Sequence, residues 1–226
     1  MAIDGLALRF EVAPPIGGAP ESLNVGQHDM KLYSYVVDHD YGLSPNPADG
    51  FCTLVHCKYN KSGKRRNIVE MAKIGDWVLG TGGQNSASAG NGKIVYIMRV
   101  DETPSFLDFL KDSRFFGRAD QCNLGGGNTA ALISKHFYYF GCNAVDIPPQ
   151  FRNPTIEKKG PGYRADLPPQ QVEQLISWFQ KNKNIGVYGE PCTPIDNYVQ
   201  PPQSFCPSDC VKSPPRPTPI CKPKCC

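Results

Sequence analysis

The sequence predicts an α+β protein, a small mixed or antiparallel β-barrel with peripheral helices. Short β-branched and aromatic runs, typical of buried strands, recur between residues 30 and 141. A clear amphipathic helical pattern comes only late, so strands and helices do not alternate as they do in a doubly wound parallel sheet. Glycines flank the central strands on both sides, and a glycine lets a barrel strand bend sharply.

The expected strands occupy the first two thirds of the chain. They are predicted over residues 30–37, 51–58, 76–81, 93–100 and 131–141. The first two are separated by SPNPADG, which consists of turn-forming residues throughout. A glycine-rich connection over 82–92 separates the third strand from the fourth. This spacing of short strands and turns favours a barrel whose ligand site lies at its mouth.

Two helices are expected on the flank of these strands. The first is short and runs from Thr103 to Asp112, with Pro104 at its first helical position. The second lies in LPPQQVEQLISWFQKN, with Asp166 near its N-cap. Its apolar residues follow the i, i+3, i+4, i+7 spacing of an amphipathic helix: Val172, Leu175, Ile176 and Phe179.

Composition excludes several classes of protein. No apolar run reaches the roughly 18 residues that span a membrane, and the first residues do not resemble a signal peptide. We therefore expect a cytoplasmic protein with reduced thiols and no membrane partner. The net charge is +3 and is concentrated in the last residues. A generic basic coat for nucleic acid is thus not indicated, although local basic patches are.

Proline, glycine and cysteine divide the chain into three parts. Residues 1–29 are predicted to be a loosely ordered extension, 30–193 the folded domain, and 194–226 a Pro/Cys-rich disordered tail. Two C-x3-C pairs in the tail loosely suggest zinc. The proline-rich spacer between them lacks the glycines needed to turn back over one ion, so we predict a reduced tail without metal. The sequence does not identify a cofactor.

Several segments of the predicted domain resemble one family, in the family's order. They are MKLYSYVVDHDYGLSPNPADGFCTLVHCK, IGDWVLGTGG, GKIVYIMRV, ALISKHFYYFG and IPPQFR. They are similar to the second family of nucleotide-modification-associated domains, found in bacteria and bacteriophages. The resemblance implies a context of DNA or nucleotide modification and names no reaction.

A second resemblance lies in two strands that each follow a glycine, GDWVLG and then GKIVYIM. It resembles PUA-like and EVE-like domains, small barrels that hold a flipped or modified base. The chain also departs from the family pattern at two places. The segment over 117–129 is shorter than relatives imply, and the basic loop KYNKSGKRRNIVEMA is longer.

The residue types suit recognition of a base, because aromatic rings stack on bases, polar edges read them and cations hold phosphates. We predict a ligand at a barrel mouth around Trp77, contacted by Tyr35, Tyr41, Asn46, Asp76, Trp77, Gly80, Thr81, Gly82, Arg99 and Tyr139. The basic loop is predicted to contact phosphates through Lys58, Lys64, Arg65 and Arg66. The alternatives are core packing for the aromatic rings and a solvated surface for the basic loop.

Catalysis is the competing interpretation. Asp38 and Asp40 flank His39, and two carboxylates with an imidazole form a common acid/base or metal-binding set. The same residues also serve as turn and cap residues at strand ends. Three functions therefore remain open: a domain that binds nucleic acid or a nucleotide, an enzyme of base modification that uses Asp38, Asp40 or Asp76, and a protein-interaction module in a modification or phage-defence complex.

Overall fold

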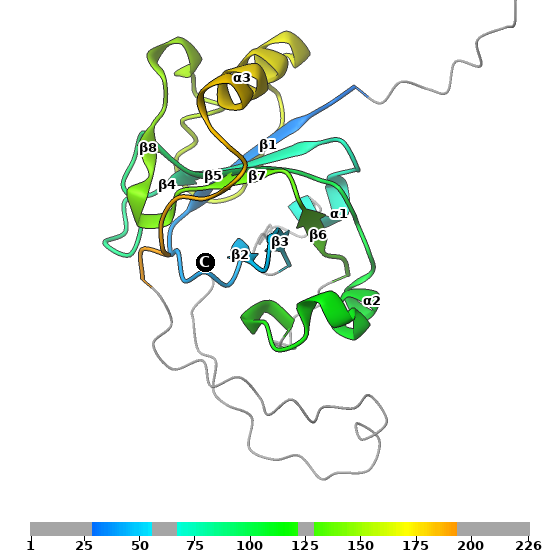
Figure 1. Ribbon diagram of the computed structural model, residues 1–226. Helices are drawn as coiled ribbons and strands as arrows, with labels where there is room; N and C mark the ends of the chain where they lie inside the picture. The colour runs from blue at the N-terminus through cyan, green and yellow to red at the C-terminus, as the bar shows by residue number, and fades with distance from the viewer. Residues whose placement is uncertain (1–28, 56–66, 122–128, 194–226) are drawn as a thin grey trace, which may run out of the picture.

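The computed structural model describes residues 29–55, 67–121 and 129–193 (Figure 1). The predicted N-terminal extension up to residue 28, the four predicted phosphate contacts of the basic loop and the predicted tail lie outside these residues. Within the described part, no helix has the length and apolar character needed to cross a membrane. The described residues form two β-sheets and a small number of helices.

The larger sheet has seven strands of mixed direction. Its order is β10-β7-β5-β4-β1-β9, and β8 pairs with β5 beside this path. The bounds are β1 Leu32–Val37, β4 Trp77–Gly82, β5 Lys93–Arg99, β7 Phe137–Tyr139, β8 Val145–Asp146, β9 Tyr163–Arg164 and β10 Gly186–Val187. β1 pairs with β4 in parallel, whereas β4 and β5 are antiparallel.

Among the described strands, the larger sheet does not close on itself, because β10 and β9 end its path without pairing with each other. The α+β class predicted from the sequence is confirmed, but no closed barrel is found. Closure would require every strand to have two neighbours. Here a separate sheet of three strands covers one face instead. Its strands are β2 Asn46–Ala48, β3 Phe51–Leu54 and β6 Leu132–Ser134, in that order.

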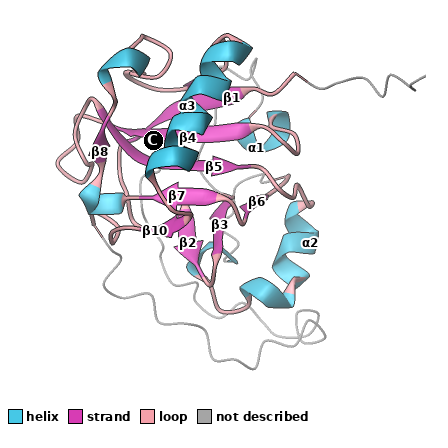
Figure 2. Cartoon of the chain, turned by 45° about the horizontal axis from the view of Figure 1, so that its top comes forward, coloured by secondary structure: helices cyan, strands magenta, loops and turns pink. Residues whose placement is uncertain are grey.

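The molecule is layered in the order α3, larger sheet, smaller sheet, α2 (Figures 1 and 2). Apolar clusters fill each interface between these layers. The helices are α1 Ile68–Met71, α2 Phe106–Lys111 and α3 Pro169–Asn182, with short 3-10 turns at Ser113–Phe115, Ala119–Gln121, Gly141–Asn143 and Pro149–Phe151. The amphipathic pattern of α3 is confirmed, because all four of its predicted apolar residues are buried.

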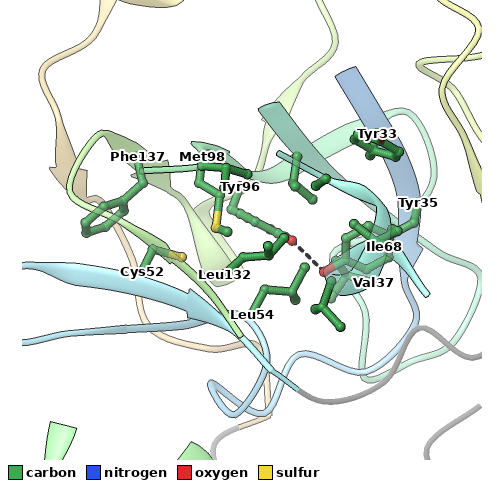
Figure 3. Close-up of a cluster of buried hydrophobic side chains, with 14 of the residues drawn as sticks. Tyr33, Tyr35, Val37, Cys52, Leu54, Ile68, Tyr96, Met98, Leu132 and Phe137 are labelled. Carbon is green, nitrogen blue, oxygen red and sulfur yellow. Dashed lines mark hydrogen bonds between the residues drawn. The ribbon is translucent and has the colours of Figure 1, made fainter. Parts of the chain in front are cut away.

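The space between the two sheets is rich in tyrosine. Tyr35 of β1 and Tyr96 of β5 meet there, with their hydroxyl oxygens 2.7 Å apart, against Leu54 of β3 (Figure 3). Both tyrosines are almost fully buried. Each hydroxyl gives the other a hydrogen-bond partner, which offsets the desolvation of both.

Three predicted elements need correction. The strand expected over 131–141 is two strands, β6 and β7, which lie in different sheets. They are separated by a turn in which the Ser134 hydroxyl both accepts from the His136 N–H and donates to its carbonyl. α2 begins after Ser105, whose hydroxyl caps it, and not after Thr103. α3 has no side-chain cap, because its N-cap residue is Pro168; Asp166 accepts a hydrogen bond from Thr155.

A glycine in β4 is a sharp test of this packing. A Cβ added at Gly80 would lie 2.3 Å from a ring carbon of Tyr96 and 2.7 Å from Val37. We expect Gly80→Ala to lower the free energy of unfolding by about 1–3 kcal/mol through overpacking, measured by urea denaturation. In a Tyr96→Leu background the same methyl should be less destabilising. Equal losses in both backgrounds would contradict contact with Tyr96 as the cause.

Candidate functional site

Two groups of predicted site residues lie at opposite ends of one parallel strand pair. In the register of β1 with β4, Trp77 lies opposite Leu32 and Gly82 lies opposite Val37. The two pairs are five residue steps apart along the strands, which is about 16 Å at the usual rise. Trp77 therefore belongs to the amino end of the pair, and the Asp38–Tyr41 turn follows the carboxyl end. The structure does not bring them around one mouth.

At the amino end, Asp76 and Trp77 have structural contacts. The Asp76 carboxylate accepts hydrogen bonds from the backbone N–H groups of Lys31 and Lys73, both at 2.9 Å. It thereby joins the start of β1 to the turn before β4. Trp77 is 2% exposed and packs edge-to-face against His136, with ring centroids 5.1 Å apart. An indole in this position presents no face on which a base can stack.

Arg99 and Thr81 are also engaged by their neighbours. Arg99 is exposed at the end of β5 and donates from Nε to Asp101 Oδ1 at 2.7 Å. Thr81 is buried and donates to the Tyr35 carbonyl at 3.2 Å. The glycines of β4 permit close packing, since a Cβ at Gly82 would lie 2.0 Å from the Gly90 carbonyl oxygen. Thr81 and the two glycines are therefore buried packing positions of the sheet, and the exposed Arg99 is paired with Asp101.

Asn46 belongs to a buried clamp in the smaller sheet. Its carbonyl, together with that of Ala48, accepts hydrogen bonds from the Arg118 guanidinium at 2.7 and 2.9 Å. Arg118 also contacts Thr53 and forms a buried ion pair with Asp120 at 3.4 Å. The clamp holds the β2–β3 hairpin to the 3-10 turn after residue 118. Sequence reasoning missed Arg118 and Asp120, which stand two apart in a segment with no strong helical or strand pattern.

The carboxyl end of the β1–β4 pair carries partly exposed functional side chains. We call this group, Asp38, His39, Tyr41 and Asn85, the β1–β4 rim. The rings of His39 and Tyr41 stack, with centroids 5.6 Å apart and planes 22° from parallel. His39 Nε2 lies 3.0 Å from Asn85 Nδ2, and His39 Nδ1 lies 3.8 Å from Asp38 Oδ2. The side chains of Asp38 and His39 are 40% and 25% exposed.

The loop after β4 is fastened to this rim by backbone contacts. Ser88 donates to the carbonyl of Val37 at 2.6 Å and accepts from the N–H of Gly83 at 2.7 Å. Asn85 caps its own loop by accepting from the Ala87 N–H at 2.8 Å. A Cβ on Gly83 would lie 2.6 Å from Asp38 Oδ1, so only glycine lets the loop approach this closely. Asn85 was not predicted as a site residue, because an isolated Asn in a Ser/Gly-rich loop is typical of a turn.

Asp40 connects the turn after β1 to neighbouring segments through buried hydrogen bonds. It is 1% exposed, and the Tyr139 hydroxyl lies 2.9 and 2.8 Å from its two oxygens. Its backbone carbonyl accepts from the N–H of Thr193 at 2.9 Å. Burial raises the pKa of the Asp40 carboxyl, and the bonds from Tyr139 and from the N–H groups of Gly42 and Cys192 partly oppose that rise. Burial and the Asp40 charge together raise the pKa of Tyr139, so its phenol remains the donor.

The rim offers an aromatic surface, a carboxylate and an amide. These groups can stack on a planar heterocycle and form hydrogen bonds with its edge. The two ring nitrogens of His39 face different partners: Nε2 lies within hydrogen-bond distance of the Asn85 amide, and Nδ1 faces Asp38. In the described ranges, no group of three or more His, Cys, Asp or Glu side chains is arranged to hold a metal ion. The thiol of Cys52 is fully buried and its pKa is raised by burial, so it packs as a small apolar group.

Comparison with known proteins places this geometry in a family context. A family model described as nucleotide modification associated domain 2 matches residues 29–124 and 121–197, which is most of the chain. The two matches meet inside the segment whose length departs from the family pattern. No curated protein and no solved structure matches the chain. The resemblance to this family is confirmed, whereas the likeness to PUA-like and EVE-like barrels is not.

The bond between Tyr139 and Asp40 predicts an asymmetry between adjacent tyrosines. Tyr139→Phe leaves a buried carboxylate without its side-chain donor, so we expect unfolding free energy to fall by about 1.5–3 kcal/mol in chemical denaturation. Tyr138→Phe is the matched control, because the hydroxyl of the buried Tyr138 faces only the partly exposed ring of His136, at 3.3 Å, and no carboxylate. Its loss should be about 1 kcal/mol or less. Similar losses in the two variants would contradict the anchoring role.

Asp40 also predicts a pH dependence of stability. Its folded pKa is raised above the ordinary value of 3.8, mainly by burial. As pH rises above 3.8, the unfolded chain releases this proton before the folded protein does, so the contribution of Asp40 to stability falls through the folded pKa. We expect the unfolding free energy of the wild type relative to Asp40→Asn to decrease over that window, in urea titrations from about pH 3.5 to 7. A difference that rises with pH would overturn the assignment.

Proposed function

The chain belongs to the nucleotide modification associated domain 2 family, and on that premise we propose that it binds a nucleotide or a nucleic-acid base at the β1–β4 rim. The observation that carries the proposal is the stacked pair of His39 and Tyr41 beside the exposed carboxylate of Asp38. This combination lies at the carboxyl end of a parallel strand pair, where open sheets commonly bind ligands. The proposal moves the ligand away from Trp77, whose ring is buried.

Stacking supplies the first part of the recognition. Every base has a π-face, and stacking on an aromatic side chain contributes about 1–3 kcal/mol per base. His39 is held in one orientation by its contact with Asn85 and by the ring of Tyr41. An aromatic platform that is fixed before the ligand arrives loses little side-chain entropy on binding. The pair is therefore suited to a base that lies out of its stack.

Hydrogen bonding supplies the second part. Asp38 can accept from an exocyclic amino group or a ring N–H, and the second donor hydrogen of the Asn85 amide can reach a ring nitrogen or carbonyl. Both side chains are only partly buried. A modified base differs from its parent at these same edges, so the rim supplies the type of contacts that distinguish one from the other.

The contacts beneath the rim support this assignment. Asp40 ties the turn to Tyr139 in β7, and Ser88 ties the following loop to the end of β1. Binding groups that are carried by such fixed elements keep their mutual geometry, which is a requirement for selective recognition.

Catalysis of base modification is the second candidate, and one observation favours it. Asp40 is a buried carboxyl whose pKa is raised by burial, and such groups cluster at active sites. Its oxygens are occupied by Tyr139 and its exposure is 1%, however, and Asp76 is occupied by two backbone N–H groups. Asp38 is the one of the three predicted acids that has an exposed carboxylate. A catalytic mechanism would therefore depend on Asp38 with His39.

The proposal predicts a specific loss on truncation of the rim. Tyr41→Ala and Asp38→Asn should each weaken the binding of nucleosides or short single strands by about tenfold, measured by calorimetry or fluorescence anisotropy. Phe116→Ala is the matched control, because this ring is 56% exposed and lies outside the rim. Circular dichroism and denaturation would establish that all three variants fold.

The outcomes separate the three classes of function. Equal binding by the wild type and the rim variants contradicts the proposed site. Altered nucleoside masses in DNA incubated with the protein, lost in Asp38→Asn while binding remains, would favour an enzyme. A protein that binds no nucleoside and no oligonucleotide, but is recovered with a protein from the same modification system, would favour the interaction module.

A further inference from the structure

A glycine-rich basic loop lies next to the β1–β4 rim. β9 is antiparallel to β1, with Tyr35 paired to Tyr163 and Ser34 paired to Arg164. The residues that precede Tyr163 therefore lie toward the carboxyl end of β1, where the rim begins. These residues, Lys158-Lys159-Gly160-Pro161-Gly162, are here called the lysine loop. The carboxylate of Asp38 faces the other neighbour of β1, since its Oδ1 approaches Gly83 after β4.

The loop is folded around its own ammonium group. Lys158 is 8% exposed, and its Nζ donates to the carbonyls of Lys159, Gly160 and Pro161 at 3.0, 2.8 and 2.8 Å. Three carbonyl oxygens match the three hydrogens of an ammonium group. The backbone of the loop is thereby held with its carbonyls turned inward.

This arrangement orients the backbone amides outward. A trans peptide is planar, and its C=O and N–H point in opposite directions. The carbonyl of Lys159 shares its peptide with the N–H of Gly160, and that of Pro161 shares its peptide with the N–H of Gly162. Both N–H groups therefore point away from the Lys158 ammonium. In the described part of the chain, neither has an acceptor.

Both glycines of the loop are exposed, with open space on the side where a Cβ would lie. Gly160 and Gly162 are exposed, with φ of +72° and +81°, and no atom lies within 4 Å of a Cβ built on either residue. A side chain at either position would be strained, so glycine is required by the conformation.

The charge around the loop is positive and only weakly compensated. Across the described ranges, no carboxylate lies within ion-pair distance of the Lys158 ammonium. Arg164 is close enough to lower the pKa of Lys158, after burial itself. The guanidinium of Arg164 is 48% exposed and reaches Asp166 only at 3.8 Å. Lys159 adds a further exposed cationic side chain to the loop.

We propose that the lysine loop binds phosphate, and that this is the phosphate of the nucleotide whose base is held at the β1–β4 rim. The N–H groups of Gly160 and Gly162 donate to the phosphate oxygens, and Arg164 and Lys159 supply the side-chain cations. Lys158 holds the amides in place and provides positive charge behind them. The assignment of the phosphate to a nucleotide rests on the proposed function, whereas the anion site itself rests on the loop alone.

Two measurements test the site. In the first, inorganic phosphate is titrated into isotope-labelled protein, and the amide resonances of Gly160 and Gly162 are followed by NMR. In the second, calorimetry compares a deoxynucleoside with its 5′-monophosphate and with a short oligonucleotide that lacks a terminal phosphate. We expect phosphate to shift both amides and the monophosphate to bind about tenfold or more tightly than the nucleoside, as bonds to a charged group predict.

Surface substitutions separate the loop from the rim. The double variant Lys159→Gln/Arg164→Gln should bring the affinity for the monophosphate close to that for the nucleoside, while nucleoside binding is unchanged. Lys181→Gln, which removes an exposed lysine of α3, should leave both affinities as in the wild type. An oligonucleotide that retains the gain without a terminal phosphate would identify the ligand as a phosphodiester of the nucleic-acid backbone.

The possible failures are distinguishable. Phosphate that leaves both glycine amides unmoved, together with equal affinities for nucleoside and monophosphate, overturns the lysine loop as an anion site and leaves the rim standing. Phosphate that shifts the amides of a protein which binds no nucleoside supports the anion site and overturns the nucleotide assignment. A loss of phosphate binding in Lys181→Gln equal to that in the double variant would show a diffuse effect of net charge and overturn the site.

Discussion

The parallel pairing of β1 with β4 is the constraint on which the other features depend. Six consecutive residue pairs fix the two strands in direction and register. Parallel strands cannot be joined by a tight turn, so the connection between them must leave the sheet and return. In this protein that connection carries β2, β3 and α1, which supply much of the layer beneath the larger sheet. The same pairing sends both strands to one edge, where their following loops meet.

The interior between the two sheets contains many buried polar groups, and these groups have hydrogen-bond partners. In the described residues, no fully buried side-chain nitrogen or oxygen lacks a hydrogen-bond partner. Tyr35 and Tyr96 satisfy each other, Tyr139 satisfies Asp40, and Arg118 satisfies the carbonyls of β2. Such networks are intolerant of single deletions, because removal of one member leaves another buried and unpaired.

The sequence was informative where one physical effect acted alone. The β-branched and aromatic runs of β1, β4 and β5 and the apolar stripe of α3 are local signals, and all four elements were predicted close to their observed bounds. The prediction of one strand over 131–141 was wrong because β6 and β7 are similarly apolar. Only a two-residue turn that begins at Lys135 separates the two strands. Strands of two residues, such as β9, carry no periodicity and depend wholly on their partner.

The candidate site was less predictable for a similar reason. Asp38 and Tyr41 were identified because they follow a strand in a recognisable turn, but the partner of His39, Asn85, lies in another loop. Trp77 and Asp76 were grouped with them because a closed barrel would bring strand ends together; the parallel direction of β4 separates them instead. The Lys-Lys-Gly-Pro-Gly segment was visible in the sequence, yet its position beside the rim depends on a pairing between residues far apart in the chain.

That distance has a consequence for synthesis. Ser34 pairs with Arg164, a residue made 130 positions later. At the usual bacterial to eukaryotic elongation rates, the gap lasts about 6–26 s. During that interval β1 has at most one sheet neighbour, and its other edge presents open N–H and C=O groups flanked by large apolar side chains, an arrangement that invites pairing between nascent chains. Expression at high ribosome density therefore exposes this protein to aggregation through β1, however stable the completed sheet is.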